Sequence, residues 1–279
     1  MKETVVQTYE SDTFNQALDE SLHPGGLDLT EYMACTAGIT KDSIVLDIAT
    51  GRGTSACFLA EFCTCCIEGI DLSRKALAQA RTKAAGRGLS HRVRFHLADV
   101  EALPFSDASF DYVVSECSFS LLPDKPAGAA EIARVLKPGG KLAFTDMFLQ
   151  DQFSDELKGL VPFDCCFTGA LTRDDYEALF DRAGLETQIF EDHSFSLREI
   201  TDKLRGEYGT IQAFWNQFGK GTESLCAGVR DAGETGAGGY GSLWKRIFAE
   251  GKPGYCLMVM EKDGDGFLKE PGATVGRTR

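Results

Sequence analysis

Residues 44–53 read Ile-Val-Leu-Asp-Ile-Ala-Thr-Gly-Arg-Gly, and this stretch decides the fold. The apolar run 44–48, which contains a single acid at Asp47, predicts a buried parallel strand. Gly51 and Gly53 then let the backbone turn tightly and approach a ligand where a Cβ would obstruct it. Residues 54–62 predict a helix whose N-terminal amides face the same place. The strand is therefore expected to end at a binding site.

The two glycines alone admit two kinds of cofactor. Together with Ala56 they fit the dinucleotide pattern G-x-G-x-x-G/A, and Asp71 follows about 20 residues later, as in NAD sites. An ionised Asp47 just ahead of the turn would repel a pyrophosphate but would accept a hydrogen bond from an ammonium group. A ligand with a cationic amino acid end therefore suits the loop better, while an NAD-type site stays open as the alternative.

Strand and helix patterns alternate between residues 44 and 146. Strands are predicted at 44–49, 66–71, 92–97, 110–115 and 141–146, and helices at 54–62, 73–86 and 127–136. Alternation of this kind indicates parallel strands with crossover helices on both faces. Ligands of such sheets bind at the carboxyl ends of the strands, where Asp47, Asp71, Asp99 and residues 115–117 fall. Residues 137–140, Lys-Pro-Gly-Gly, are expected to form a turn without a site residue.

This arrangement resembles the S-adenosylmethionine site of class I methyltransferases as far as about residue 190. The matching blocks are the glycine loop, Ile67-Glu-Gly-Ile-Asp-Leu-Ser73, His96-Leu-Ala-Asp-Val-Glu-Ala-Leu-Pro-Phe105, Phe110-Asp-Tyr-Val-Val114 and Leu136-Lys-Pro-Gly-Gly-Lys-Leu-Ala-Phe144. The resemblance implies that the glycine loop lies under the methionine part of the cofactor. It also implies that Asp71 takes the ribose hydroxyls and that Asp99 reads the adenine amino group. Arg52 departs from the family pattern and adds a charge beside the ligand.

The resemblance implies a cofactor, S-adenosylmethionine, and a set of residues that bind it. These are Asp47, Ala49, Thr50, Gly51, Gly53, Asp71, Leu72, Asp99, Val100 and Ser115. The sulfonium already makes the methyl group electrophilic, so the protein has to align a nucleophile and exclude water. A base is needed only if the nucleophile arrives protonated. Glu116, just past the fourth strand, is the candidate catalytic acid or base, with a supporting acid as the equally open alternative.

The fold class expected is α/β, a doubly wound and mostly parallel seven-stranded sheet of the Rossmann-like methyltransferase type. It carries an N-terminal lid and a helical insertion before the last strand. Thr172 is expected to cap a helix over 173–183, and strands at 186–192 and 254–261 are expected to pair antiparallel. The corresponding ranges are 1–43 for the lid, 44–193 for the cofactor-binding core, 194–253 for the insertion, 254–262 for the last strand and 263–279 for a flexible tail.

The lid segment contains Leu22-His-Pro-Gly-Gly-Leu-Asp-Leu-Thr30. Pro24 and the two glycines predict a turn, and Thr30 is expected to cap a helix that begins at Glu31. Segments before the first strand often fold over the cofactor in the family that this chain resembles. A tight entry turn to the helix is an equally good interpretation. The lid candidates are Tyr9, His23, Gly25 and Gly26.

About 60 residues separate the last two strands, which a minimal domain of this kind joins as a hairpin. Helices are predicted at 196–205 and 242–250, with an aromatic segment at 211–218 and a glycine-rich stretch at 228–241. The insertion is too apolar for a solvated loop, and a loop of this length is unusual without a function. We expect a cap over the substrate, with Phe214 and Trp215 in contact with it. A packing or dimer surface is the alternative.

Ten cysteines are scattered through strands and helices and form no secreted disulfide framework, so reduced thiols are expected. The stretch Cys166-Phe-Thr-Gly-Ala-Leu171 resembles one in arsenite methyltransferases, which implies that Cys166 is a catalytic metalloid ligand. Cys165 and Cys117 are the further substrate-facing thiols, since thiolates select soft partners. Cysteine is also a common buried hydrophobe. Cys63-Thr-Cys-Cys66 lacks a second ligand pair, and no metal site is predicted.

Composition narrows the partners and the compartment. The chain has 279 residues, 43% of them apolar, which is enough for a full core, and a formal net charge of −13. An acidic balance argues against a nucleic-acid groove, which needs clustered Lys and Arg, so a small-molecule substrate is expected. No apolar run reaches the roughly 20 residues that cross a bilayer. We therefore expect no membrane partner, a cytoplasmic protein, and a monomer or homodimer.

The sequence thus predicts a methyltransferase that moves a methyl group from S-adenosylmethionine to a small molecule. Thiolate-assisted methylation of arsenite is the alternative within that class. An NAD-dependent oxidoreductase is a weaker alternative, because Asp47 opposes it and no hydride-handling His or Tyr is evident. A protein that binds S-adenosylmethionine without catalysis is the alternative from a different class.

Overall fold

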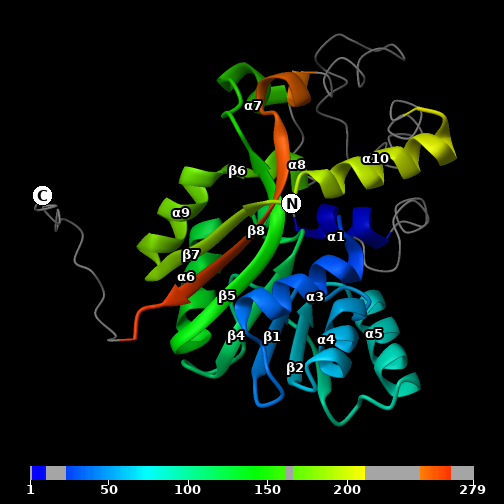
Figure 1. Cartoon of the computed structure of the whole chain (residues 1–279), viewed down its shortest axis with the longest axis vertical. Coiled ribbons are helices and arrows are strands. Elements are labelled where there is room, and N and C mark those ends of the chain that lie inside the picture. Colours follow the sequence, from blue (N-terminus) through cyan, green and yellow to red (C-terminus); the bar gives the residue numbers. More distant parts are fainter. Residues whose placement is uncertain (1, 11–22, 161–165, 211–245, 265–279) are drawn as a thin grey trace, which may run out of the picture.

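An eight-stranded mixed sheet forms the centre of the protein, for which the computed structural model describes residues 2–10, 23–160, 166–210 and 246–264 (Figure 1). The strand order is β3-β2-β1-β4-β5-β8-β7, and β6 pairs with β5. β8 is antiparallel to both its neighbours, whereas the other pairs are parallel. The strands are β1 Ile44–Ile48, β2 Cys66–Asp71, β3 Val93–Leu97, β4 Phe110–Glu116, β5 Leu136–Leu149, β6 Leu171–Thr172, β7 Leu185–Asp192 and β8 Pro253–Lys262. The predicted α/β class is confirmed.

Helices cover both faces of the sheet. One apolar cluster joins α3, α4 and α5 to the sheet, and a second joins α6 and α9 to its other face. β1 shows how the sequence divides its side chains, because Val45 belongs to the first cluster while Leu46 and Ile48 belong to the second. The helices are α1 Lys2–Glu10, α3 Gly26–Ala37, α4 Thr54–Phe62, α5 Arg74–Gly86, α6 Lys125–Val135, α7 Asp155–Leu160, α8 Cys166–Gly169, α9 Arg173–Arg182 and α10 Phe195–Tyr208, with a 3-10 turn, η1, at Phe119–Leu121.

The register of the parallel strands aligns their carboxyl ends. Ile48 is level with Ile70 on β2 and with Ser115 on β4, and Asp71 is level with Leu97 on β3. Parallel strands in register end at one edge of a sheet, and the loops that follow them meet there. The fold therefore brings the segments after β1, β2, β3 and β4 to a common place.

Two details of the sheet differ from the sequence prediction. The predicted count of seven strands omits β6, whose two residues are too short to show any periodicity. The predicted turn at 137–140 lies inside β5, which runs from Leu136 to Leu149. The pairing with β4 nevertheless jumps there from Leu136 to Lys141, and Gly139 has φ +73°, so these residues bulge out of the ladder.

The predicted cap at Thr30 is wrong. α3 begins four residues earlier, at Gly26, and its N-cap is Gly25 with φ +79°. Glycine reaches this left-handed conformation without steric cost, so the helix needs no side-chain cap to begin. Thr30 is buried in the middle of α3, where its hydroxyl contacts Gly26 O and the carboxylate of Glu116. The predicted cap at Thr172 is confirmed, since its hydroxyl accepts from the backbone N–H of Asp175.

The predicted insertion contains α10, which extends the expected helix at 196–205 at both ends. Residues 246–250 are helical, within the helix expected at 242–250. Phe214, Trp215 and the rest of 211–245 lie outside the described residues. The domain ranges given above stay predictions.

Gly53 of the glycine loop packs closely against α5 and β3, and a substitution there tests this packing. Gly53 has φ +69°, and a Cβ there would lie 2.8 Å from both the Ala80 Cβ and a ring carbon of Phe95. Gly53→Ala should lower the free energy of unfolding in urea by about 2 kcal/mol, from overpacking and backbone strain together. Gly86→Ala is the matched control, because a Cβ at that helical position meets nothing within 4 Å. Equal stability of Gly53→Ala and the native protein would contradict this packing.

Candidate functional site

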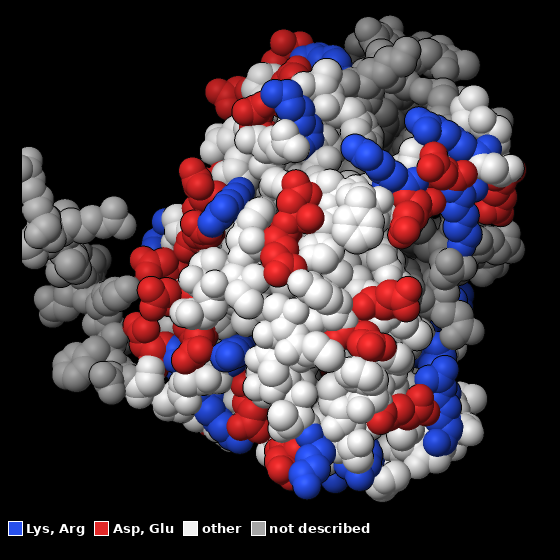
Figure 2. Space-filling model, in the orientation of Figure 1, with Lys and Arg blue, Asp and Glu red and all other residues white. Residues whose placement is uncertain are grey.

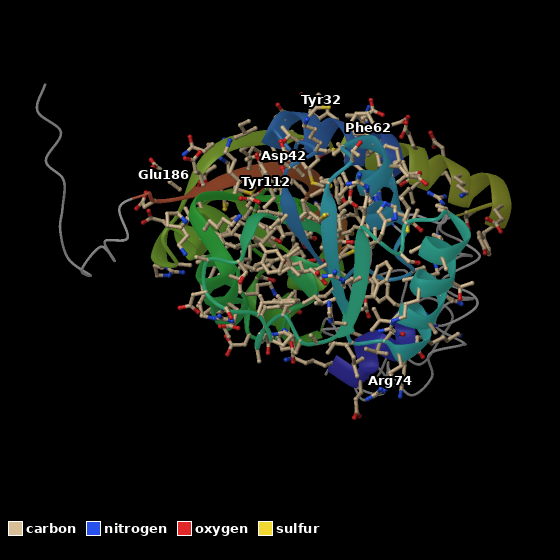
Figure 3. All side chains as sticks on the ribbon, turned by 90° about the horizontal axis from the view of Figure 1, so that it is seen from below. Tyr32, Asp42, Phe62, Arg74, Tyr112 and Glu186 are labelled. Carbon is tan, nitrogen blue, oxygen red and sulfur yellow. The ribbon has the colours of Figure 1, made fainter. Side chains whose placement is uncertain are left out.

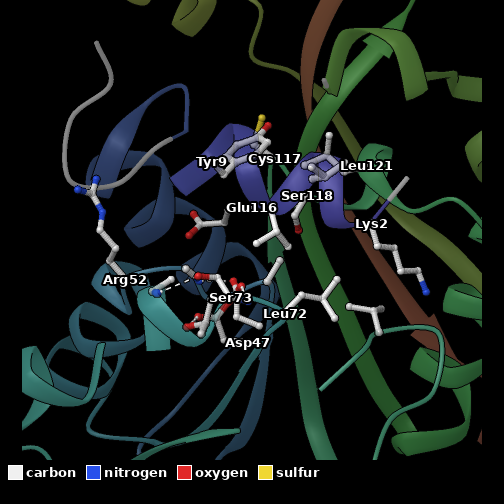
Figure 4. A pocket seen from close by; sticks show the side chains of 18 of the residues that line it. Lys2, Tyr9, Asp47, Arg52, Leu72, Ser73, Glu116, Cys117, Ser118 and Leu121 are labelled. Carbon is white, nitrogen blue, oxygen red and sulfur yellow. Dashed lines mark hydrogen bonds between the residues drawn. The ribbon is translucent and has the colours of Figure 1, made fainter. Parts of the chain in front are cut away.

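A cavity lies at the carboxyl edge of the sheet, where the loops after four parallel strands meet α1 (Figure 4). Its wall comes from the glycine loop and the start of α4, from the end of β2 and the start of α5, and from the segments after β3 and β4. The predicted cofactor residues that line it are Asp47, Ala49, Thr50, Gly51, Asp71, Leu72, Asp99 and Val100. The three predicted acids therefore share one cavity.

Asp71 joins the glycine loop to the next helix. Its Oδ2 accepts a hydrogen bond of 2.8 Å from Gly51 N–H, and its Oδ1 accepts one of 2.7 Å from Ser73 N–H. Ser73 in turn caps α5 by accepting from the N–H of Ala76. Burial raises the pKa of Asp71, and the hydrogen bonds from Ser73 and Gly51 oppose that rise. The carboxylate is thus fixed in place while it still lines the cavity.

Asp47 is buried at the end of β1, with 3% of its surface exposed. Thr50 Oγ1 donates to its Oδ2 across the turn. Burial raises the pKa of Asp47 to about 8, and the nearby charges of Glu116 and Asp71 add to the rise, while the Thr50 bond opposes it. A buried acid with this pKa holds a proton at neutral pH until a cation is placed beside it.

Asp99 lies at the opposite end of the cavity, under α1. Its Oδ2 lies 2.5 Å from the Lys2 ammonium, which also pairs with Glu101, and its Oδ1 accepts from Glu101 N–H. The cavity-lining residues of α1 are Lys2, Val5, Val6, Tyr9 and Glu10, a spacing that places them on one helical face. Glu10 contacts the Ser73 hydroxyl, so α1 is tied to the segments after both β2 and β3.

Glu116 also lines the cavity, close to Asp47. Figure 4 shows its side chain between Asp47 and the pair Tyr9 and Cys117. Thr30 Oγ1 donates to Glu116 Oε1 at 2.7 Å, and His23 Nε2 lies 3.4 Å from Glu116 Oε2. The side chains of His23 and Glu116 are 3% and 6% exposed. A histidine and a carboxylate are thus held together in a largely buried wall.

Cys117 follows Glu116 in a left-handed conformation, with φ +52°. Its N–H donates to Thr145 O on β5, which fixes this unusual turn. The thiol of Cys166, at the start of α8, hydrogen bonds with Cys117, and this contact and burial raise the pKa of Cys166 well above its usual value. Cys117 lines the cavity, whereas Cys166 lies behind it.

Several predicted site residues lie elsewhere. Ser115 lies inside β4, one residue before the strand ends at Glu116, and its side chain is fully buried. Its hydroxyl forms a hydrogen bond of 2.7 Å with the Ser118 hydroxyl. Gly53 packs beneath the loop, against Ala80 and Phe95, and does not line the cavity. Of the lid candidates, Tyr9 and His23 line the cavity, and Gly25 and Gly26 do not. Cys165, Phe214 and Trp215 lie outside the described residues.

Other lining residues were missed by the sequence prediction. They are Thr54 and Ser55 near the glycine loop, Lys75, Ala76 and Gln79 on α5, and Leu121, Leu122 and Pro123 after β4, whereas Arg52, which was expected beside the ligand, does line the cavity. The residues of α5 follow the helical spacing i, i+1, i+4 from a recognised strand end, so that pattern would have found them. Residues 118–123 belong to η1 and its flanks, which carry no periodic signal.

Comparison with known proteins identifies the family. A profile described as a methyltransferase domain matches residues 45–140. The methyltransferase GfsG of Streptomyces halstedii is 30% identical over 246 residues, which cover 87% of this chain and 82% of that protein. An arsenite methyltransferase of Aquipseudomonas alcaligenes is 34% identical over 173 residues, 58% of this chain and 49% of that protein. The chain belongs to the S-adenosylmethionine-dependent methyltransferases, as predicted.

Solved structures support the same fold. The [4+2]-cyclase SpnF superposes with a TM-score of 0.67 at 22% identity, over 93% of both chains. Phosphoethanolamine N-methyltransferase 2 of Haemonchus contortus, in complex with S-adenosyl-L-methionine, gives a TM-score of 0.69 at 19% identity, over 94% of this chain and 60% of that one. The predicted cofactor, S-adenosylmethionine, is confirmed by the family.

The cavity fits this cofactor. S-adenosylmethionine carries an ammonium, a sulfonium, ribose hydroxyls and an adenine amino group, all of which are cations or hydrogen-bond donors. The acids Asp47, Asp71 and Asp99 are spread along the wall in the matching order. Gly51 has φ +54°, and a Cβ there would meet no protein atom within 4 Å, so the backbone faces open space. A ligand can therefore lie directly against the loop.

Three further observations concern membrane spans, metal sites and surface charge in the described part of the chain. No helix there is both long and apolar enough to cross a membrane. No cluster of three His, Cys, Asp or Glu side chains there is arranged to hold a metal ion. On the face shown in Figure 2, Lys and Arg are interspersed with Asp and Glu and form no continuous basic patch.

Proton release should accompany cofactor binding. Because the pKa of Asp47 is raised to about 8 by burial, the carboxyl is mostly protonated at pH 7 and must ionise to pair with a cationic ammonium. Calorimetric titration of S-adenosylmethionine at pH 7 in phosphate and in Tris should give enthalpies that differ by the heat of buffer protonation. The difference should vanish in Asp47→Asn. Identical enthalpies for the native protein in both buffers would contradict this.

Proposed function

We propose that the protein transfers a methyl group from S-adenosylmethionine to a small-molecule acceptor that enters beside Glu116. The observation that carries this proposal is the meeting of Asp47, Asp71 and Asp99 with the glycine loop in one cavity. In this assignment Asp47 and the loop hold the methionine end, Asp71 the ribose and Asp99 the adenine. The adjoining space, lined by Glu116, Cys117 and Ser118, receives the acceptor.

The protein has to supply position and shelter. The bound sulfonium provides an activated methyl group, so the protein's contribution is to orient the acceptor toward it and to keep water out. α1 covers the nucleotide half of the cavity and is tied at both ends, by Lys2 to Asp99 and by Glu10 to Ser73. We propose that the insertion 194–253 covers the acceptor half and that its aromatic segment, with Phe214 and Trp215, contacts the acceptor. Nearby relatives named for small acceptors support this class of substrate.

Cofactor binding tests the assignment. Asp71→Ala removes the acceptor of the ribose hydroxyls and the tether of Gly51, and should weaken S-adenosylmethionine binding at least tenfold in calorimetry. Asp42→Ala is the matched control, since Asp42 is an exposed acid in the turn before β1, at the other end of the sheet (Figure 3). Tight NADH binding without S-adenosylmethionine binding would overturn the proposal. Binding without release of S-adenosylhomocysteine from any acceptor would indicate a non-catalytic binder.

Arsenite methylation is a second candidate that one observation favours. The thiols of Cys117 and Cys166 lie within hydrogen-bonding distance of each other at the acceptor end, and trivalent arsenic prefers such soft ligands. The arsenite methyltransferase relative supports this candidate, although the matched region spans only about half of that protein. Cys165 and Cys226, which could add a third thiol, lie outside the described residues.

The thiol pair has a simple test. If arsenite is the acceptor, Cys166→Ser should reduce methylation of arsenite at least a hundredfold, because one of the two adjoining sulfur ligands is lost, and binding of S-adenosylmethionine should stay the same. Methylated arsenic is measured by chromatography coupled to mass spectrometry. Cys256→Ser is the control, since Cys256 is buried in β8 and bonds to Asp146 O. Equal rates in both variants would remove this candidate.

A further inference from the structure

A second functional feature of the cavity is the buried pair of His23 and Glu116. His23 lies in the segment before α3 and Glu116 at the end of β4, so 93 residues of sequence separate two side chains that meet at 3.4 Å. Both line the cavity at its acceptor end. Burial of a histidine and a carboxylate costs folding free energy, and buried titratable groups of this kind cluster at functional sites.

The hydrogen bonds of the pair orient its atoms. The Pro24 carbonyl oxygen, 3.3 Å from His23 Nδ1, can only accept, which assigns the hydrogen to Nδ1 and leaves a lone pair on Nε2. Nε2 faces Glu116 Oε2 at 3.4 Å and Ser55 Oγ at 3.4 Å. Thr30 Oγ1 donates to the other carboxylate oxygen, Oε1, at 2.7 Å. Glu116 is thus held from one side by a donor and adjoins an imidazole nitrogen that can receive a proton.

The groups that face Glu116 come from several elements. They are His23 before α3, Asp47 on β1, Cys117 beside it and Tyr255 on β8, whose pKa is raised mainly by burial and to a small extent by the Glu116 charge. Tyr255 donates to Thr145 Oγ1 at 2.9 Å and is buried away from the cavity. Among the described side chains around Glu116, His23 is therefore the base positioned to take a proton from it.

We infer that Glu116 and His23 form the proton-accepting pair of the reaction and that the acceptor is an apolar compound with a weakly acidic hydroxyl, a phenol or an enol. The same cavity is also lined by apolar side chains, Val5 and Val6 on α1 and Leu121, Leu122 and Pro123 after β4. A positioned side-chain base removes the proton of a weakly acidic hydroxyl far more readily than that of an alkyl alcohol. The inference rests on the proposed function, which supplies the methyl donor.

The acceptor oxygen forms a bond to the methyl carbon, the carbon–sulfur bond breaks with its electron pair left on sulfur, and the hydroxyl proton passes to Glu116. From there it moves to Nε2 of His23, whose imidazolium is stabilised by the carboxylate 3.4 Å away. Each group of the pair returns to its first state when the proton leaves to solvent.

The test compares two acceptors that differ in their need for a base. 2-Naphthol keeps its proton at neutral pH, whereas 4-hydroxycoumarin is an enol that is already ionised. Release of S-adenosylhomocysteine is measured with each in the native protein, in Glu116→Gln and in His23→Gln. Glu31→Gln is the matched control, since Glu31 is an exposed glutamate on α3 next to Thr30. Binding of S-adenosylmethionine to every variant is measured by calorimetry.

With 2-naphthol, kcat should fall about a hundredfold in Glu116→Gln, at the low end of the range for loss of a general base. It should fall about tenfold in His23→Gln, because His23 acts through Glu116. The loss should shrink as pH rises and the acceptor ionises by itself, and it should be absent with 4-hydroxycoumarin. The Kd for S-adenosylmethionine should change less than threefold. A purely structural role would slow both acceptors equally at every pH.

Three results would overturn the inference. The first is an equal loss with both acceptors. The second is a tenfold or greater weakening of S-adenosylmethionine binding in Glu116→Gln with kcat unchanged, which would assign the carboxylate to the cofactor ammonium. The third is methylation of neither compound by a native protein that binds S-adenosylmethionine. Failure of the native protein to bind S-adenosylmethionine at all would instead refute the proposed function.

Discussion

The carboxylate of Asp71 holds the cofactor cavity together. One of its oxygens accepts from the Gly51 N–H and the other from the Ser73 N–H, so a single side chain links the loop after β1 to the cap of α5 after β2. The parallel register brings these loops to the same edge, and the carboxylate then fixes their separation. Because the desolvation of Asp71 is offset by these N–H donors, the acid is retained in a largely buried wall. The shape of the cavity depends on this arrangement.

Charge is distributed unevenly along the cavity. Asp99 is paired with Lys2, and Asp71 is held by backbone N–H groups, whereas among the residues that the structure describes Asp47 has only the hydroxyl of Thr50 as a donor. The acid with the least compensation has its pKa raised to about 8. A cationic ligand supplies the missing charge at that end. The electrostatics therefore favour a ligand that places an ammonium group beside Asp47, which agrees with the family.

The sequence predicted the residues whose positions follow from strand ends. Asp47, Asp71 and Asp99 could be placed because parallel strands finish at one edge and each acid follows a recognisable apolar run. Ser115 was placed in the site for the same reason, but the alternation of side chains along β4 buries it. The error is one of a single residue at the end of a strand, where the side-chain direction reverses from one position to the next.

Contacts between distant segments could not be predicted in this way. Thr30 looked like a helix cap by its type, yet Gly25 begins the helix and the hydroxyl bonds to Glu116, 86 residues away. The meeting of His23 with Glu116 and that of Lys2 with Asp99 likewise depend on how α1 and α3 pack against the sheet. Local propensity carries no information about such pairings. The same fold also occurs in a protein named as a cyclase, so the chemistry has to be argued from these side chains and not from the fold.

The central claim is that three acids at successive strand ends hold the amino, sugar and base parts of one cofactor. A crystal structure of the protein with S-adenosylhomocysteine tests it most directly. The account predicts the ribose hydroxyls on the Asp71 carboxylate, the adenine amino group beside Asp99, and the homocysteine chain against Gly51 with its ammonium toward Asp47. A ligand bound elsewhere, or in this cavity with its two ends reversed, would contradict the account.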